Sequence, residues 1–136
     1  SDTTGYANPN QIKRMFRRLR SEIGAEKMAG AHLHNTRGQG LANVLAALEV
    51  DVATFDSSLG GLGGCPFAPG ATGNIVTEDL VFMLEAMGLH TGIDLDALIA
   101  AREVLLSGLP GEVIYGNVPE AGLPKGFTYA IGRNVT

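Results

Sequence analysis

The sequence predicts an α/β fold in which short parallel strands alternate with helices. Four stretches place apolar residues at helical spacing, and two shorter stretches between them are typical of strands. The helical stretches are 9–24, 39–48, 77–88 and 94–106, and the strands are 28–34 and 52–57. Strands that alternate with helices are typical of parallel βαβ units. Both strands end in polar residues, and α/β barrels place their catalytic groups at the carboxyl ends of parallel strands.

The chain is too short for a complete barrel of this kind. Its 136 residues hold two strands and the end of a third at residues 1–5, whereas a whole (β/α)8 TIM barrel takes about 250 residues. We therefore expect the chain to be the C-terminal portion of a TIM barrel. Residues 1–109 are expected to form the barrel part, and residues 110–136, with several prolines and glycines, an irregular tail.

Capping residues set the expected ends of the helices. Asn8 is a suitable N-cap in front of Pro9, and Gly24 is suited to end the first helix. Thr77 is the expected cap of the third helix, whose acidic first turn suits the positive end of the helix dipole. The last helix is expected to begin near Asp94.

The apolar and basic faces of these helices predict what is buried. In the second helix the apolar face is expected to comprise Leu41, Val44, Leu45 and Leu48. All four methionines are expected to fill the core: Met15, Met28, Met83 and Met87. The basic residues of the first helix are expected to form its solvated face: Lys13, Arg14, Arg17, Arg18 and Arg20.

Composition excludes several classes of protein. The net charge of −4 argues against nucleic acid as a partner, and no apolar run approaches the roughly 18 residues of a membrane span. A single cysteine excludes an internal disulfide and fits a reducing compartment. No signal-like segment opens the sequence. We therefore expect a cytoplasmic protein with neither a nucleic-acid nor a membrane partner.

Two histidines and a glycine-rich segment carry the chemistry. His32 and His34 project from the same face of a strand, about 7 Å apart, so their imidazoles can converge on one cation. Cys65 follows four closely spaced glycines, where backbone can approach a ligand closely. Alone, such a histidine pair is more often hydrogen-bonded at a strand end, and a lone cysteine is usually a small buried residue. Together they favour a metal-assisted active site that still lacks an anionic ligand.

These residues carry a resemblance to a known family. The stretches 32–43 and 55–80 include His-Leu-His-Asn-Thr-Arg-Gly-Gln-Gly and Gly-Gly-Leu-Gly-Gly-Cys-Pro, with Asn74 nine residues beyond Cys65. They resemble hydroxymethylglutaryl-CoA lyases, which are metal-dependent TIM barrels related to isopropylmalate and homocitrate synthases. The resemblance extends to about Leu98 and makes residues 1–5 the end of strand 6, followed by strands 7 and 8 and their helices. Residues 121–127 resemble bacterial members.

The resemblance implies an activity and a set of site residues. Such lyases cleave 3-hydroxy-3-methylglutaryl-CoA to acetoacetate and acetyl-CoA by retro-Claisen chemistry, in leucine degradation and ketone body metabolism. By position, His32, His34 and Asn74 would hold Mg²⁺ or Mn²⁺, and His32 would also be catalytic. Cys65 would be the general acid that protonates the thioester enolate. Asp2 would face the same barrel mouth, and the parent enzyme would be a homodimer or a larger homo-oligomer.

The sequence also departs from the family pattern. The family's Arg-Asp pair at the end of strand 1 has no counterpart in this chain, so we expect the isolated chain to be inactive. Position 35 is Asn, where the mitochondrial enzymes have Asp. Two alternatives stay open: a related acyl-CoA condensing enzyme, against which Cys65 argues, and a non-catalytic metal-binding remnant.

Overall fold

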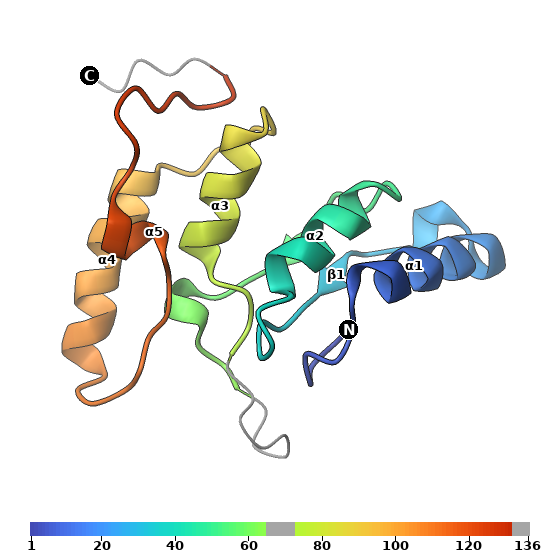
Figure 1. Ribbon diagram of the computed structural model, residues 1–136, viewed down its shortest axis with the longest axis horizontal. Helices are drawn as coiled ribbons and strands as arrows, with labels where there is room; N and C mark the ends of the chain where they lie inside the picture. Colours follow the sequence, from blue (N-terminus) through green and yellow to red (C-terminus); the bar gives the residue numbers. More distant parts are fainter. Residues whose placement is uncertain (65–72, 132–136) are drawn as a thin grey trace. The chain divides into compact units, whose positions relative to one another are not determined.

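The computed structural model describes residues 1–64 and 73–131, and the chain divides into two compact units. The first unit comprises Ser1–Ser58 and Leu62–Ile75, and the second comprises Leu59–Gly61 and Val76–Thr136. In the first unit lie α1 (Pro9–Ile23), the 3-10 helix η1 (Ala25–Lys27), β1 (Ala31–His32), α2 (Gly40–Leu48) and β2 (Phe55–Asp56) (Figure 1). In the second lie the 3-10 helix η2 (Leu59–Gly61), α3 (Thr77–Ala86), α4 (Leu95–Gly108) and α5 (Val118–Ala121). The four predicted helices are therefore present in the predicted order.

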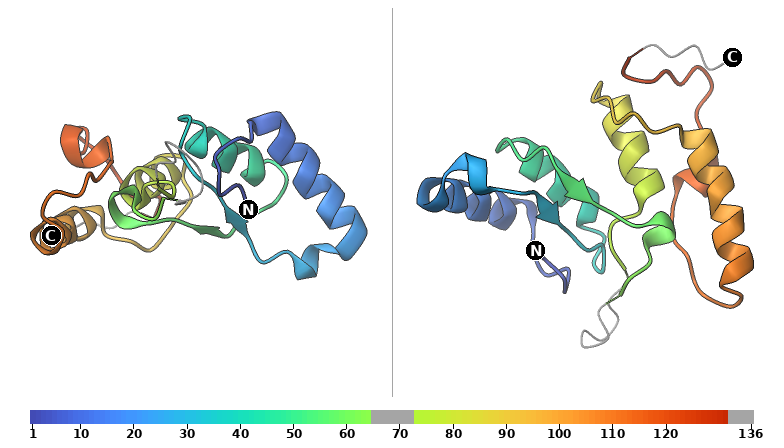
Figure 2. Two further views of the ribbon diagram at one scale, coloured as in Figure 1. Left: turned by 90° about the horizontal axis from the view of Figure 1, so that it is seen from below. Right: turned by 180° about the vertical axis from the view of Figure 1, so that it is seen from behind.

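The sheet of the first unit is parallel, as the sequence predicts. His32 of β1 lies opposite Asp56 of β2, and Figure 2 shows the two strands side by side. Asp2 forms a further parallel bridge to Leu33. Its N–H donates to the carbonyl of His32, whereas the N–H of Ala31 donates to Thr54, each at 2.9 Å. Because adjacent residues of a strand direct their polar groups to opposite edges, β1 lies between the N-terminal segment and β2.

The predicted strands are longer than the paired residues. Residues 28–30 and 52–54 lie outside the ladder, although Thr54 still accepts one hydrogen bond from it. Beyond β1, Leu33 and His34 each form a single bridge, to Asp2 and Asn74. The sequence pattern therefore located both strands correctly, while the length of each strand depends on its partners, which the sequence pattern does not reveal.

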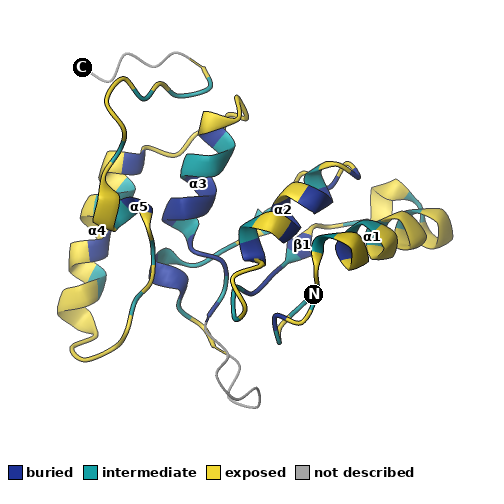
Figure 3. Ribbon diagram, in the orientation of Figure 1, coloured by how far each residue is buried: buried dark blue, intermediate teal, exposed yellow. Residues whose placement is uncertain are grey.

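The cap of α1 confirms the sequence prediction, but its apolar face does not. The Asn8 side chain accepts the Gln11 N–H and the Gln11 side chain accepts the Asn8 N–H, and Gly24 follows the helix at φ 85°. The helix packs against α2, yet Ile12 is its buried residue. Met15 is 55% exposed, so its assignment to the core is wrong, and most of α1 is coloured as exposed in Figure 3.

The basic face of α1 is solvated in part. Arg14, Arg17 and Arg18 are exposed, whereas Lys13 and Arg20 are half-buried. Those two form ion pairs with acidic residues at the end of α2 and just after it, Glu49 and Asp51. The basic residues thus divide between solvent and a contact between the two helices.

The buried face of α2 also differs from the prediction. The buried residues include Asn43, Val44, Ala46 and Ala47, whereas Leu45 is 40% exposed. Small side chains at 46 and 47 allow close packing on that side of the helix, and Leu45 lies on another. The expected leucine face is therefore wrong at Leu45.

In the described part of the second unit α3 packs against α4, α5 and η2, and the buried apolar residues include Val76, Leu80, Val81, Leu95 and Val118. Helix α3 begins at Thr77, and the N-cap position is Val76, without a side-chain hydrogen bond, which corrects Thr77 as the capping residue. Asp94 caps α4 as predicted and accepts the Ala97 N–H. Met87 is 48% exposed, which corrects its assignment to the core.

The described part of the segment after residue 109 is more ordered than the sequence indicates. The Asp79 carboxylate accepts the N–H groups of Asn117 and Val118 where α5 begins. Further along, Phe127 stacks on Phe82, and the Tyr129 hydroxyl accepts the N–H of Leu95. The domain boundary at 109 stays a prediction. No helix within residues 1–64 and 73–131 is long and apolar enough to cross a membrane.

Candidate functional site

The two histidines of the sequence motif lie together in the first unit. Their ring centroids are 5.0 Å apart, and the two Nε2 atoms are separated by 3.1 Å. His34 is buried at 3% exposure, whereas the side chain of His32 is 31% exposed. His32 at the end of β1 and His34 two residues later therefore direct their Nε2 atoms toward each other.

A carboxylate that the sequence reasoning missed fixes one of these rings. Asp56 Oδ1 lies 2.6 Å from Nδ1 of His32, and the parallel register places these two residues opposite each other. When Asp56 accepts the Nδ1 proton, the lone pair of the neutral imidazole stands on Nε2, the nitrogen that faces His34. The available signal was an acidic residue at the end of the neighbouring strand, which the register pairs with His32.

Asn74 joins the histidines through the backbone. It forms an antiparallel bridge to His34, and its side-chain N–H donates to the carbonyl of Leu62 at 3.1 Å. Its Oδ1 atom is buried and has no hydrogen-bond partner within the described residues, and the same holds for Nδ1 of His34. Such an oxygen is costly to bury unless it has a partner or a function.

Gly63 shows how closely the backbone approaches Asn74. Its φ is 97°, and a Cβ placed on it would lie 2.9 Å from the Asn74 side-chain nitrogen. Any larger residue at 63 would be strained and would displace the amide group. The glycine segment thus helps to define the position of the Asn74 side chain.

The arrangement fits a divalent cation. Two ligands about 2.1 Å from one octahedral ion and at right angles lie about 3.0 Å apart, close to the separation of the two Nε2 atoms. The unpaired Oδ1 of Asn74 would add an oxygen ligand to the two nitrogens, a mixed set typical of catalytic metals. Within the described residues, no group of three or more His, Cys, Asp or Glu side chains could hold a metal. Asn74, whose buried Oδ1 has no partner within the described residues, stays the predicted third ligand.

Other residues singled out in the sequence have different outcomes. Cys65 lies outside the described residues, so its role as general acid stays a prediction. The two carboxylate oxygens of Asp2 accept the N–H groups of Tyr6 and Ala7, each at 3.0 Å, which gives this side chain a part in the local turn. Asn35 accepts the N–H of Gly40 at the start of α2.

An α/β chain with two histidines and an asparagine close together at strand ends is typical of enzymes that use a bound metal ion in catalysis. Comparison with known proteins assigns the family: residues 1–105 match the HMGL-like family model, and the chain belongs to this family. Enzymes of this family generally depend on a divalent metal ion. The family resemblance drawn from the His-x-His and glycine motifs is thereby confirmed.

Individual relatives sharpen the assignment. The chain is 48% identical over 122 residues to (R)-citramalyl-CoA lyase of Chloroflexus aurantiacus, covering 90% of this chain and 38% of the relative. It is 46% identical over 102 residues to 3-hydroxy-3-isohexenylglutaryl-CoA/hydroxymethylglutaryl-CoA lyase of Pseudomonas aeruginosa, covering 75% and 34%.

A solved structure extends the likeness to the fold. An HMG-CoA lyase from Acinetobacter baumannii, in complex with coenzyme A and 3-methylmalate, matches 93% of this chain and 41% of its own at a TM-score of 0.83 and 53% identity. The chain thus spans about two fifths or less of the length of these relatives. The α/β fold of the described residues is that of a part of such lyases.

Proposed function

We propose that this chain supplies the metal-binding strands of a carbon–carbon lyase that cleaves 3-hydroxy-3-methylglutaryl-CoA to acetoacetate and acetyl-CoA. The observation that carries the proposal is the pair of Nε2 atoms 3.1 Å apart, with Asn74 bridged to His34, in a chain of the HMGL-like family. The proposed cofactor is Mg²⁺ or Mn²⁺, held by His32, His34 and Asn74. The proposed assembly is a homodimer or larger, in the cytoplasm.

The strand order supports a place for the chain within a (β/α)8 barrel. The segment at Asp2, then β1, then β2 are parallel neighbours in that order. This is the order expected for the end of strand 6 followed by strands 7 and 8. In such a barrel the residues that end β1 and β2 belong to the catalytic face.

The cation and the histidines would have distinct tasks. When bound, a divalent ion supplies Lewis-acid chemistry that favours loss of a proton from a substrate hydroxyl group. Asp56 keeps the Nδ1 proton of His32 in place and so fixes the orientation of its ring. We retain His32 as a catalytic residue because its ring is the partly exposed one of the pair, whereas His34 is buried.

Cys65 would complete the reaction. The C3 hydroxyl gives its proton to solvent water, the ketone of acetoacetate forms as the C2–C3 bond breaks, and the bonding pair passes to C2 as a thioester enolate. The Cys65 thiol, as the proposed general acid, would donate its proton to C2. The products are then acetoacetate and acetyl-CoA, and the thiolate recovers a proton from solvent.

A second substrate is favoured by one observation, the 48% identity to (R)-citramalyl-CoA lyase. Citramalyl-CoA carries the same tertiary C3 hydroxyl and thioester but has one methylene fewer before its carboxylate, and its cleavage yields pyruvate and acetyl-CoA. The same residues can serve both reactions, because the bond that breaks and the enolate that forms are the same.

Product analysis of the intact protein that contains this chain tests the proposal. We expect acetoacetate and acetyl-CoA from hydroxymethylglutaryl-CoA in the presence of Mg²⁺ or Mn²⁺, and loss of activity in EDTA that either ion restores. Pyruvate formation from citramalyl-CoA with no cleavage of hydroxymethylglutaryl-CoA would assign the second substrate. Cleavage of neither thioester under any of these conditions would contradict a lyase.

A further inference from the structure

A closed ring of hydrogen bonds surrounds Gly60 in the second unit. The Gly60 N–H lies 3.1 Å from both carboxylate oxygens of Glu78, and Nη1 of Arg102 donates to Glu78 Oε1 at 2.9 Å. The same nitrogen donates to the carbonyl of Tyr115 at 2.6 Å, and the Tyr115 N–H returns to the Gly60 carbonyl at 2.7 Å. Both polar atoms of one glycine are therefore held, and Arg102 closes the ring.

Burial makes this ring sensitive to the loss of a member. Glu78 is 0% exposed and Arg102 6%. Removing one partner of a buried ion pair leaves the other charge without compensation in a medium of low dielectric constant. Without Arg102, the Glu78 carboxylate would keep a single backbone N–H from Gly60 among the bonds described, and the Tyr115 carbonyl would lose its donor.

Gly60 itself is fitted to this position. Its φ is 63°, and an added Cβ would lie 2.9 Å from Cβ of Ile114 and 3.4 Å from Nη1 of Arg102. In the sequence, Gly60 begins the glycine segment, residues 60–64, which leads directly to Cys65. An ion pair that only joined α3 to α4 would need no residue besides Glu78 and Arg102. Here the hydrogen bonds of the ring also hold the backbone N–H and carbonyl of Gly60.

We propose that Arg102 is a positioning residue that holds the start of the glycine segment in place. Arg102 acts through Glu78 and Tyr115 on the backbone of Gly60, the residue from which the chain continues toward Cys65. The consequence for catalysis rests on the proposed function, in which Cys65 delivers the proton. The ring itself lies within the second unit and can be tested without that assumption.

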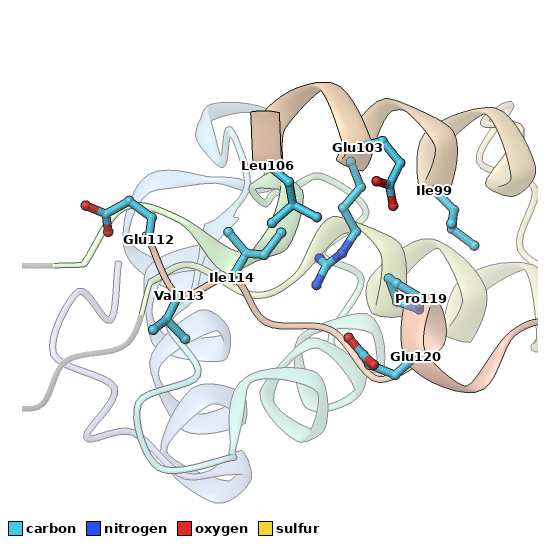
Figure 4. A pocket seen from close by; sticks show the side chains of 9 residues that line it. Ile99, Glu103, Leu106, Glu112, Val113, Ile114, Pro119 and Glu120 are labelled. Carbon is cyan, nitrogen blue, oxygen red and sulfur yellow. The ribbon is translucent and has the colours of Figure 1, made fainter. Parts of the chain in front are cut away.

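A cavity beside Arg102 makes chemical rescue possible. It has a volume of about 520 Å³ and is lined by residues that include Arg102, Ile99, Glu103, Leu106 and Pro119. Figure 4 labels Ile99, Glu103, Leu106 and Pro119 around this cavity, together with Ile114. A guanidinium ion is small enough to enter such a space and to replace the head group of a truncated arginine.

Backbone amide exchange tests the ring directly. In Arg102→Ala we expect faster exchange at the Gly60 and Tyr115 amides, while the Leu80 amide, bonded to the carbonyl of Val76 at the N-cap of α3, keeps its wild-type rate. About 20 mM guanidinium chloride, far below the molar concentrations that unfold proteins, should restore protection at both sites, whereas NaCl should not. Glu103→Gln is the matched control, because Glu103 lines the same cavity but is outside the ring.

Kinetics of the intact protein test the positioning role. We expect Arg102→Ala to lower kcat by about 10²-fold with little change in KM, the effect of a misplacement of about 1 Å. Guanidinium should restore much of it, and Arg102→Lys, which keeps the charge, should lose less. If Arg102→Ala does not fold, Arg102→Lys is compared with Arg102→Gln in the same way.

The outcomes separate this proposal from the proposed function. Unchanged exchange at Gly60 and Tyr115 in the Arg102 variants would overturn the ring, and lost protection with an unchanged kcat would overturn the positioning role. A wild-type protein without lyase activity would contradict the proposed function, while the exchange data would still decide whether Arg102 holds Gly60.

Discussion

The two units of the chain treat their buried polar atoms in opposite ways. In the second unit Glu78, Asp79, Glu85 and Arg102 are all buried, and each has charged or backbone partners. In the first unit His34 Nδ1 and Asn74 Oδ1 are buried without a hydrogen-bond partner among the described residues. Paired buried groups hold a fold together, whereas unpaired ones are costly and mark places where a ligand can complete the bonding. The first unit also holds Thr36 Oγ1 and Asn43 Oδ1, likewise unpaired within the described residues, so these atoms alone do not mark a metal site, but Asn74 Oδ1 is the unpaired oxygen that belongs to a proposed ligand.

Replacing His34 tests the first unit at its most sensitive point. We expect His34→Ala to abolish measurable Mn²⁺ binding and lyase turnover in the intact protein, because a direct ligand is lost from a small set. The loss should exceed the 10- to 100-fold range that is typical when only an outer partner of a ligand is removed. Calorimetric titration with Mn²⁺ measures the affinity, and Arg18→Ala, on the exposed face of α1, is the control. Wild-type affinity in His34→Ala would remove it from the metal site.

Replacing Cys65 separates proton transfer from metal binding. We expect Cys65→Ala to lower kcat by roughly 10²-fold or more, the usual range for a general acid, while Mn²⁺ affinity stays at the wild-type value. Steady-state kinetics and metal titration on one preparation give both quantities. Unchanged turnover would exclude the thiol from the mechanism.

Replacing Asp56 tests whether a residue of the first unit that is not itself a proposed ligand orients His32. Asp56→Asn keeps the size of the side chain but weakens its ability to hold the Nδ1 proton of His32. We expect metal affinity to fall by about 10- to 100-fold, less than for His34→Ala. Asp51→Asn is a suitable control, because Asp51 pairs with Arg20 and not with a histidine. Equal affinities for wild type and Asp56→Asn would show that the register contact does not tune the ring.

Glu85 gives the smallest effect and a pH dependence from the second unit. Burial alone would raise the pKa of Glu85, but hydrogen bonds from the Thr91 hydroxyl and N–H and from the Ala130 N–H, together with nearby His90, hold its pKa below the ordinary value. Since the folded pKa is the lower one, this stabilisation is present above about pH 4.5 and is lost as the pH falls through the folded pKa.

Glu85→Gln should therefore destabilise the protein by about 1–3 kcal/mol at pH 7, because an amide cannot accept all three bonds. The difference from wild type should shrink as the pH is lowered below about 4.5. Urea unfolding at several pH values measures it, with the exposed Glu120→Gln as control. A difference that stays constant from pH 7 to pH 3 would contradict a contribution from the charged form.

Local signals in the sequence predicted the features that depend on neighbours in the chain. The caps at Asn8 and Asp94 and the glycine end at Gly24 are formed by residues within four positions of their partners. The histidine pair also lies on one strand, so the alternation of side chains was enough to bring the two rings together. The two histidine candidates were therefore accessible from spacing alone, whereas Asn74 was proposed only from the family resemblance.

Features that depend on distant partners escaped prediction. The burial of Arg102 follows from a carboxylate 24 residues away, and the contact of Asp56 with His32 follows from strand register. The exposure of Met15 and Leu45 shows the same limit in the other direction, because an apolar residue is buried only where another element covers it. Helical periodicity predicts which residues share a face, but whether that face is buried depends on the elements that pack against it.

Because His32 pairs with Asp56 across the sheet, a change of strand register would alter the hydrogen bonding of a proposed metal ligand. A slip of β2 by one residue would turn Asp56 to the other face of the sheet and bring an uncharged neighbour, Phe55 or Ser57, opposite His32. Such a misfolded chain would keep its helices, and therefore its circular dichroism, yet bind metal more weakly. At the proposed metal site, the affinity for a divalent ion would therefore report folding fidelity, and it would distinguish refolded preparations that have the same circular dichroism.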